Sequence, residues 1–129
     1  MNAQVIETRI AKVWMTDIGI IYSRFADARH ITLQDGQETI AAIVRVADGC
    51  PRPLIADFTS ATLGMVDRSA RLSESYPALS AAVSAIAVIT KSPVVRFLIN
   101  LMVRLNSSQT KMMLFANETE AIEWLKGYL

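Results

Sequence analysis

The chain has 129 residues, a length typical of a single domain that buries about two thirds of the surface its unfolded form exposes. Hydrophobic residues make up 52% of it and no low-complexity stretch interrupts it, so the composition excludes a disordered chain. With 13 basic and 12 acidic residues the formal net charge is +1, which gives no electrostatic reason to expect nucleic acid or an anionic membrane as a partner.

The first nine residues lack the basic start and apolar run of a secretory signal, so we expect the protein to stay in the cytoplasm.

The sequence begins with a predicted hairpin. The stretch from Ile6 to Met15 alternates with an imperfect period of two, which predicts a strand. A turn over Thr16 to Gly19 leads into a second predicted strand, Gly19 to Phe25. So short a connection makes the two strands an antiparallel pair.

A capped helix is predicted next. Thr32 can cap it, and Asp35 places a negative charge in its first turn. Gly49, followed by two prolines, supplies the stop. The apolar residues at helical spacing are Ile40, Ile43, Val44 and Ala47. Arg52 to Phe58 is then a nearly continuous apolar run, as expected of a central strand that is buried on both faces.

The second half of the sequence continues the alternation of predicted strands and helices. A polar helix is predicted from about Asp67 to Ser75, with Pro77 closing it or opening a further turn. Val83 to Thr90 is another apolar strand. Ser92 and Pro93 then begin a helix that extends to about Asn106.

The C-terminal residues predict one more strand and one more helix. Lys111 to Ala116 reads as the last strand, and Asn117 follows it as a capping residue with two acidic residues in the first helical turn. The complete order is β-β-α-β-α-β-α-β-α. It predicts an α/β fold with one mixed sheet of about five strands and flanking helices, in a single domain over residues 1–129.

Four segments carry a resemblance to a known family. They are Ile31 to Gly36, Pro53 to Phe58, Ala87 to Pro93 and Leu114 to Leu125. The last is the most specific, because it is a strand that leads into a capped helix ending in Ala-Ile-Glu-Trp-Leu. With the order of elements, these segments resemble the STAS fold of bacterial anti-sigma factor antagonists, and more closely the STAS/SpoIIAA-like families of uncharacterised bacterial proteins. The resemblance implies a regulatory module that presents a surface to a protein partner.

The resemblance also implies a modification site. In antagonists of this fold, a partner kinase phosphorylates a serine of an Asp-Ser-Ser-Gly sequence at the start of the helix after the central strand. The corresponding stretch here is Asp67-Arg68-Ser69-Ala70, which makes Ser69 the candidate. A phosphate there would meet exposed helix amides and could pair with Arg68 or Arg71. The alternative is an ordinary polar residue in the first turn of a helix.

The predicted helix that begins at Pro93 is unusually apolar. Its polar residues up to Leu105 are spaced by four and occupy only about 80° of the helix circumference. The remaining apolar stripe is wider than one sheet face can cover. We therefore expect the uncovered apolar surface to contact another helix of the same chain, a second subunit or an apolar ligand. The candidate interface or ligand-wall residues are Phe97, Leu98, Leu101, Met102, Leu105, Arg96 and Arg104.

A candidate anion site lies at the rim of the predicted sheet. Ligands of α/β proteins bind outside the carboxyl ends of parallel strands, which here are Asp57 to Ser60 and Thr90 to Ser92. Lys91 and Ser92, beside a helix start, are placed to receive a small anion. The alternatives are that Ser92 is a plain helix cap and that Lys91 is a solvated surface charge.

The sequence offers no recognisable catalytic constellation. His30 is the sole histidine and Cys50 the sole cysteine, so we predict no catalytic residues, no metal site and no cofactor. The scattered glycines form no phosphate-binding loop. A cleft joining Asp57, His30 and Cys50 would be needed to support an enzyme.

Three classes of function therefore remain. The first is a non-catalytic regulatory or protein-interaction module that self-associates through its apolar helix as a homo-oligomer. The second is a binder of a small apolar or amphipathic, lipid-like ligand along residues 93–105. The third, an enzyme, has the least support. No membrane span is expected, because the longest apolar-rich stretch, Val94 to Leu105, is far shorter than the ~20 residues that cross a bilayer.

Overall fold

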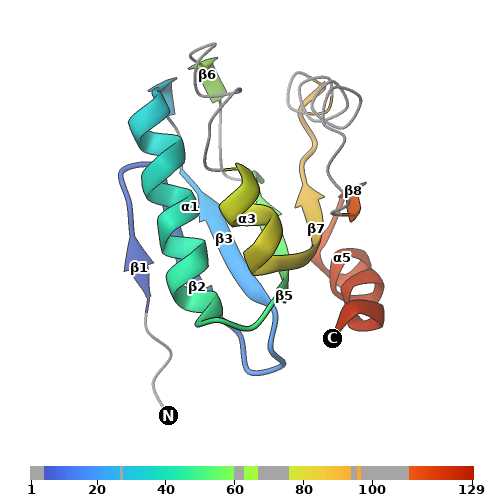
Figure 1. Cartoon of the computed structure of the whole chain (residues 1–129). Coiled ribbons are helices and arrows are strands. Elements are labelled where there is room, and N and C mark those ends of the chain that lie inside the picture. The colour runs from blue at the N-terminus through green and yellow to red at the C-terminus, as the bar shows by residue number, and fades with distance from the viewer. Residues whose placement is uncertain (1–4, 27, 60–62, 67–75, 94–95, 97–110) are drawn as a thin grey trace.

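The computed structural model describes residues 5–26, 28–59, 63–66, 76–93, 96 and 111–129, and it contains a six-stranded mixed sheet in the order β1-β2-β3-β5-β7-β8 (Figure 1). A second, two-stranded parallel sheet joins β4 to β6. The strands are β1 (Ile6–Glu7), β2 (Ala11–Met15), β3 (Ile21–Phe25), β4 (Ala28–Ile31), β5 (Arg52–Asp57), β6 (Leu63–Val66), β7 (Val83–Ile89) and β8 (Lys111–Phe115). The helices are α1 (Leu33–Ala47), α3 (Tyr76–Ala82) and α5 (Glu118–Leu125), followed by the 3-10 helix η1 (Lys126–Tyr128). The predicted α/β class is confirmed, with six rather than about five strands in the mixed sheet.

The first predicted strand, Ile6 to Met15, is in fact two strands. β1 pairs antiparallel with β2, so the chain reverses direction between them. Thr8 makes this turn: its N–H donates to the Ala11 carbonyl at 2.8 Å, and its hydroxyl accepts from the Ala11 N–H at 3.1 Å. Side-chain hydrogen bonds of this kind compete with strand pairing. The prediction of one continuous strand was therefore wrong.

β2 and β3 form the predicted antiparallel hairpin. Gly19 has a φ of 87°, a conformation that glycine adopts readily and other residues do not. Around it, the Thr16 N–H donates to the Ile20 carbonyl at 2.9 Å. The turn therefore extends to Ile20, and β3 begins at Ile21 rather than at Gly19.

A capping box begins α1 where the sequence predicted it. The Thr32 hydroxyl accepts from the Asp35 N–H at 3.1 Å, and the Asp35 carboxylate accepts from the Thr32 N–H at 2.9 Å. Arg9, from the turn between β1 and β2, donates two hydrogen bonds to the same carboxylate. These bonds outweigh the effect of burial and hold the pKa of Asp35 well below its usual range. At the other end of α1, Asp48 and Gly49 both have positive φ and end the helix.

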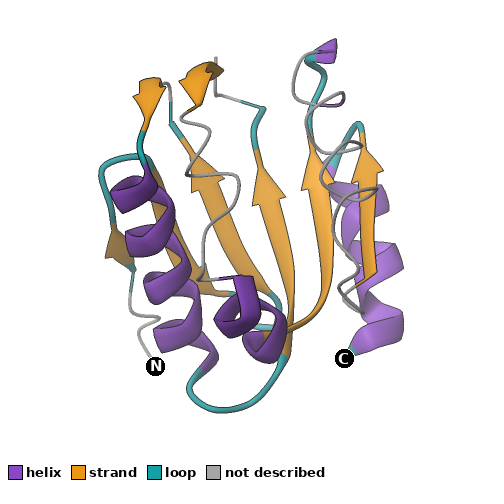
Figure 2. Cartoon of the chain, turned by 45° about the horizontal axis from the view of Figure 1, so that its top comes forward, coloured by secondary structure: helices purple, strands orange, loops and turns teal. Residues whose placement is uncertain are grey.

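Helices cover both faces of the main sheet (Figure 2). Successive residues of a strand point to opposite faces, so Leu54 and Ala56 join the core beneath α1 and α3 while Ile55 joins the core beneath α5. The central position predicted for this strand is confirmed, because β5 lies between β3 and β7 and pairs parallel with both. Within the described ranges, no helix has the length and apolar character needed to cross a bilayer.

The sequence analysis did not anticipate the two-stranded sheet or the position of α3. It assigned neither β4 nor β6 to a strand. The helix before β7 begins at Tyr76, with Pro77 as its second residue, where a helix needs no donor from the proline nitrogen. The helix predicted from Asp67 to Ser75 lies outside the described residues, as does most of the helix predicted from Pro93 to Asn106.

Candidate functional site

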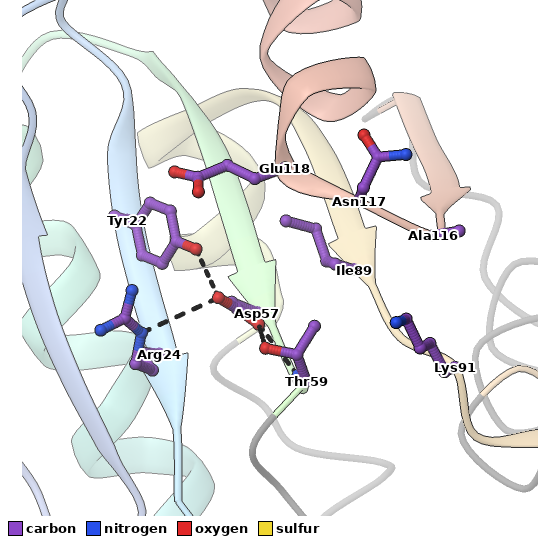
Figure 3. Close-up of a pocket in the computed structure, with 9 residues that line it drawn as sticks. All are labelled: Tyr22, Arg24, Asp57, Thr59, Ile89, Lys91, Ala116, Asn117 and Glu118. Atoms are coloured by element: carbon purple, nitrogen blue, oxygen red, sulfur yellow. Dashed lines mark hydrogen bonds and ion pairs between the residues drawn. The ribbon is translucent and has the colours of Figure 1, made fainter.

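A pocket of about 380 Å³ opens where the parallel strands of the main sheet end (Figure 3). Its walls come from β3, from the ends of β5 and β7 and the residues after them, and from the residues around the start of α5. We call it the carboxyl-edge pocket. Its lining residues are Tyr22, Arg24, Asp57, Thr59, Ile89, Lys91, Ala116, Asn117 and Glu118.

Sheet register brings three of these residues into one row. Arg24 of β3 is paired with Asp57 of β5, and Asp57 is paired in turn with Ile89 of β7. Tyr22 lies two residues before Arg24 and therefore on the same face of the sheet. This is the face that α5 covers, so the helix start closes one side of the pocket.

Asp57 is the centre of a hydrogen-bond network. Its side chain is only 6% exposed, and both of its carboxylate oxygens are engaged. Oδ1 accepts from the Thr59 N–H at 2.9 Å and from the Thr59 hydroxyl at 2.6 Å. Oδ2 accepts from the Tyr22 hydroxyl, and Arg24 Nε lies 3.8 Å from it. The network leaves Asp57 little capacity to bind a further donor.

The network fixes the protonation states of both acidic groups. Burial and the hydrogen bond to Asp57 raise the pKa of the Tyr22 phenol to about 12. Burial alone would favour the neutral form of Asp57, but the hydrogen bonds from Thr59 and Tyr22 outweigh it and lower the pKa of this carboxyl. At neutral pH the pocket therefore holds a neutral Tyr22 and an ionised Asp57.

Arg24 lies close to two aromatic rings. Trp14 and Tyr22 stack with ring centroids 4.8 Å apart, and the Arg24 guanidinium carbon lies 5.5 Å from one centroid and 5.3 Å from the other. Contacts of this kind attract a cation to an aromatic face. Because 54% of the side chain is exposed, the Arg24 guanidinium presents a positive charge to solvent beside the pocket.

The structure places one of the two candidate anion-site residues in this pocket. Lys91 is exposed and lines it, and Figure 3 shows its ammonium group turned toward the pocket interior. Ser92 does not line the pocket. Its N–H donates to the Thr90 hydroxyl at 3.1 Å, and its carbonyl accepts from the Arg96 N–H at 3.0 Å. The second bond is the one expected of a residue that caps a helix.

The fold keeps Cys50 away from the two other residues that an enzyme would have required beside it. His30 belongs to β4, just before α1, and Cys50 follows the other end of that helix. A helix of 15 residues is about 22 Å long, so the two backbone positions are far from each other. Asp57 ends β5, whereas Cys50 precedes the start of the same strand. Among the residues that the structure describes, no three His, Cys, Asp or Glu side chains gather into a metal site.

Other candidates fall on parts of the chain that the structure does not describe. Ser69 is one of them. The same holds for the apolar-helix residues Phe97, Leu98, Leu101, Met102, Arg104 and Leu105. Arg96 is described and exposed.

The sequence analysis missed Tyr22, Arg24 and Glu118. It assigned the first two to a strand and Glu118 to the first turn of a helix, but considered only the rims formed by Asp57 to Ser60 and Thr90 to Ser92. The available signal was the parallel order of the later strands, because a strand beside β5 that runs in the same direction ends at the same edge.

Comparison with known proteins adds a family. The model of DUF7793, a domain of unknown function, matches residues 13–129. The chain belongs to the DUF7793 family. The match includes every residue that lines the carboxyl-edge pocket, so the pocket is part of the DUF7793 domain itself. No curated protein is detectably similar to the chain.

A solved structure with a similar fold supports the fold assignment of this DUF7793 protein. It is an uncharacterized protein of the DUF3478 family with a SpoIIAA-like fold, from Shewanella loihica PV-4. The match has a TM-score of 0.59 and 11% sequence identity, and it covers 96% of this chain and 92% of the other. The predicted SpoIIAA-like fold is therefore confirmed.

Proposed function

We propose that this DUF7793 protein is a non-catalytic regulatory module of STAS type that binds a protein partner at the carboxyl edge of its main sheet. Two findings support the proposal. The fold is SpoIIAA-like, and the pocket at this edge is lined by charged side chains of both signs, of which Asp57 and Arg24 contact their neighbours.

The observation that carries the proposal is the hydrogen bonding of the Asp57 carboxylate. A general base must have a free lone pair and a pKa near the working pH. Asp57 is poorly suited on both counts, because Tyr22 and Thr59 fill three of its about four acceptor positions and lower its pKa. The carboxylate serves as an anchor, which ties the end of β5 to β3 and to the segment that follows it.

The charged groups around this anchor are the ones available to a partner. Arg24 and Lys91 provide positive charge and Glu118 negative charge, and all three side chains reach solvent. Charges of both signs on a rigid frame favour orientation of one specific partner over non-specific attraction. The mixed pattern therefore suits recognition of a protein surface.

Self-association through residues 93–105 remains part of the proposal on sequence grounds alone. The wide apolar stripe of that segment supports it. The two surfaces differ in character, since the carboxyl edge is charged and the stripe is apolar, so both a homo-oligomer and a separate partner can be accommodated.

Site-specific crosslinking tests the proposal. A photoreactive lysine analogue replaces Lys91 in one sample and Gln37 in the matched control, and both samples are irradiated in cells. Gln37 is exposed on α1, which covers the other face of the sheet. We expect a discrete protein adduct from position 91 that is absent from position 37 and that disappears when Arg24→Glu is added. The same adducts from both positions, or none from position 91, would contradict the proposal.

A further inference from the structure

The carboxyl-edge pocket has the dimensions of a small-molecule site. Its volume of about 380 Å³ falls near the lower end of the ~300–1,000 Å³ range that ligand pockets occupy. Its lining includes apolar surface from Ile89 and Ala116 among the charged groups. A space of this size accommodates a small metabolite.

The charges that line the pocket balance formally. Arg24 and Lys91 contribute two positive charges, and Asp57 and Glu118 contribute two negative ones. A ligand that carried only negative charge would meet two carboxylates, and one that carried only positive charge would meet two cations. Neither class is complementary to the whole lining.

Two of the four charged groups are already engaged with their neighbours. Asp57 accepts hydrogen bonds from Tyr22 and Thr59, and Arg24 is held by Asp57 and by the aromatic rings beneath it. Lys91 and Glu118 differ from them. Within the described part of the chain, neither has a hydrogen bond or an ion pair through its side chain, and Figure 3 shows them on opposite sides of Ile89.

We propose that the carboxyl-edge pocket binds a small zwitterion of the amino-acid class, which carries one carboxylate and one protonated amine. The ligand carboxylate pairs with the Lys91 ammonium group, and the ligand amine pairs with the Glu118 carboxylate. The apolar side chain of the ligand lies against Ile89, which lines the same pocket. Charge-assisted hydrogen bonds of this kind are the stronger ones in proteins. The inference goes beyond the proposed function, because it requires no protein partner.

A matched ligand series tests this inference on the purified full-length chain. Thermal unfolding is measured with each of the common amino acids at millimolar concentration, and calorimetry then gives the affinity of those that raise the unfolding midpoint. Each active amino acid is compared with its deaminated acid and its decarboxylated amine. For leucine these are 4-methylpentanoate and 3-methylbutylamine. We expect at least one amino acid to raise the midpoint while its two counterparts do not.

Two variants and two controls locate the site. Lys91→Met and Glu118→Gln should each weaken binding about tenfold or more, because each removes one charge-assisted contact. Lys111→Met on β8 and Glu38→Gln on α1 change exposed residues away from the pocket and should retain the wild-type affinity.

Three results would overturn the inference. The first is that no amino acid shifts the midpoint. The second is that a deaminated acid or a decarboxylated amine binds as tightly as the amino acid itself. The third is wild-type affinity in both pocket variants. None of these results bears on the crosslinking experiment, which reports protein contacts.

Discussion

The hydroxyl group of Tyr22 donates a hydrogen bond to the buried carboxylate of Asp57, 35 residues later in the chain. The bond connects β3 to β5 at the edge where the pocket lies. It has two consequences that can be measured separately, one for stability and one for titration.

The Tyr22→Phe variant should lower the free energy of unfolding by about 1–3 kcal/mol, because it leaves a buried carboxylate oxygen without its hydroxyl donor. Urea denaturation at neutral pH measures the effect. Tyr128→Phe is the matched control, since the Tyr128 hydroxyl makes no hydrogen bond to any residue that the structure describes. Equal stability of the two variants would show that the Tyr22 hydroxyl contributes nothing.

The same hydroxyl should determine how the protein responds to alkali. The pKa of Tyr22 rises from 10.0 to about 12 on folding, so the unfolded chain releases this proton first as the pH increases. The stability that this difference supplies is fully present below pH 10 and is lost as the pH rises through about 12. Tyrosinate absorbance should show a component near pH 12 that Tyr22→Phe removes. A titration that is the same in the variant and the wild type would refute this assignment.

Two glycines should respond to alanine with opposite signs. Gly36 lies within α1 and an added Cβ meets nothing within 4 Å, so Gly36→Ala should stabilise the protein by about 0.5–1 kcal/mol. Gly19 has a φ of +87° and its Cβ would lie 3.2 Å from an Arg52 nitrogen. Gly19→Ala should therefore destabilise by about 1–2 kcal/mol. The urea midpoints of the two variants measure these changes. If both substitutions raised stability, or both lowered it, the hairpin turn would not have the conformation described.

The apolar segment at 93–105 should determine the oligomeric state. Native mass spectrometry is expected to show a multiple of the 14.2 kDa chain mass. Leu101→Glu in the apolar stripe should reduce the assembly to single chains, whereas Asn100→Glu on the polar side of the predicted helix should not. A single chain with a small additional mass would favour the lipid-like ligand instead. A single chain with no guest would contradict both hypotheses.

Local signals in the sequence were sufficient for much of the fold. Thr32 and Asp35 predicted the start of α1 because a capping box depends on residues three apart. Asn117 predicted the start of α5 in the same way, and its side chain accepts from the Glu120 N–H at 2.9 Å. The apolar run that became β5 predicted its own central position.

Features that depend on long-range pairing were not predictable from local patterns. β4 and β6 are short strands that pair across more than 30 residues, and neither has a distinct alternation. The break between β1 and β2 depends on the side chain of Thr8, which looks like one more residue of an alternating strand.

The residues of the candidate site, too, were predictable only where a local pattern in the sequence marked them. Asp57 and Lys91 were predicted because they lie at the carboxyl ends of two largely apolar strands, where ligands of α/β proteins bind. Tyr22 and Arg24 were missed, since they reach the pocket only through the register between β3 and β5. The end of a strand is easier to predict from sequence alone than which strands lie next to it in the sheet.

The titration of Asp57 tests the central claim most directly, which is that this carboxylate is an anchor rather than a base. Carbon-13 NMR of labelled aspartate side chains reports it, with the Asp57→Asn variant identifying the signal. We predict a midpoint below the ordinary aspartate value of about 3.9, and a higher midpoint in Tyr22→Phe, where one of the hydrogen bonds that stabilise the charge is absent. A midpoint near neutral pH would contradict the account, because a buried carboxyl that exchanges its proton there is equipped for catalysis.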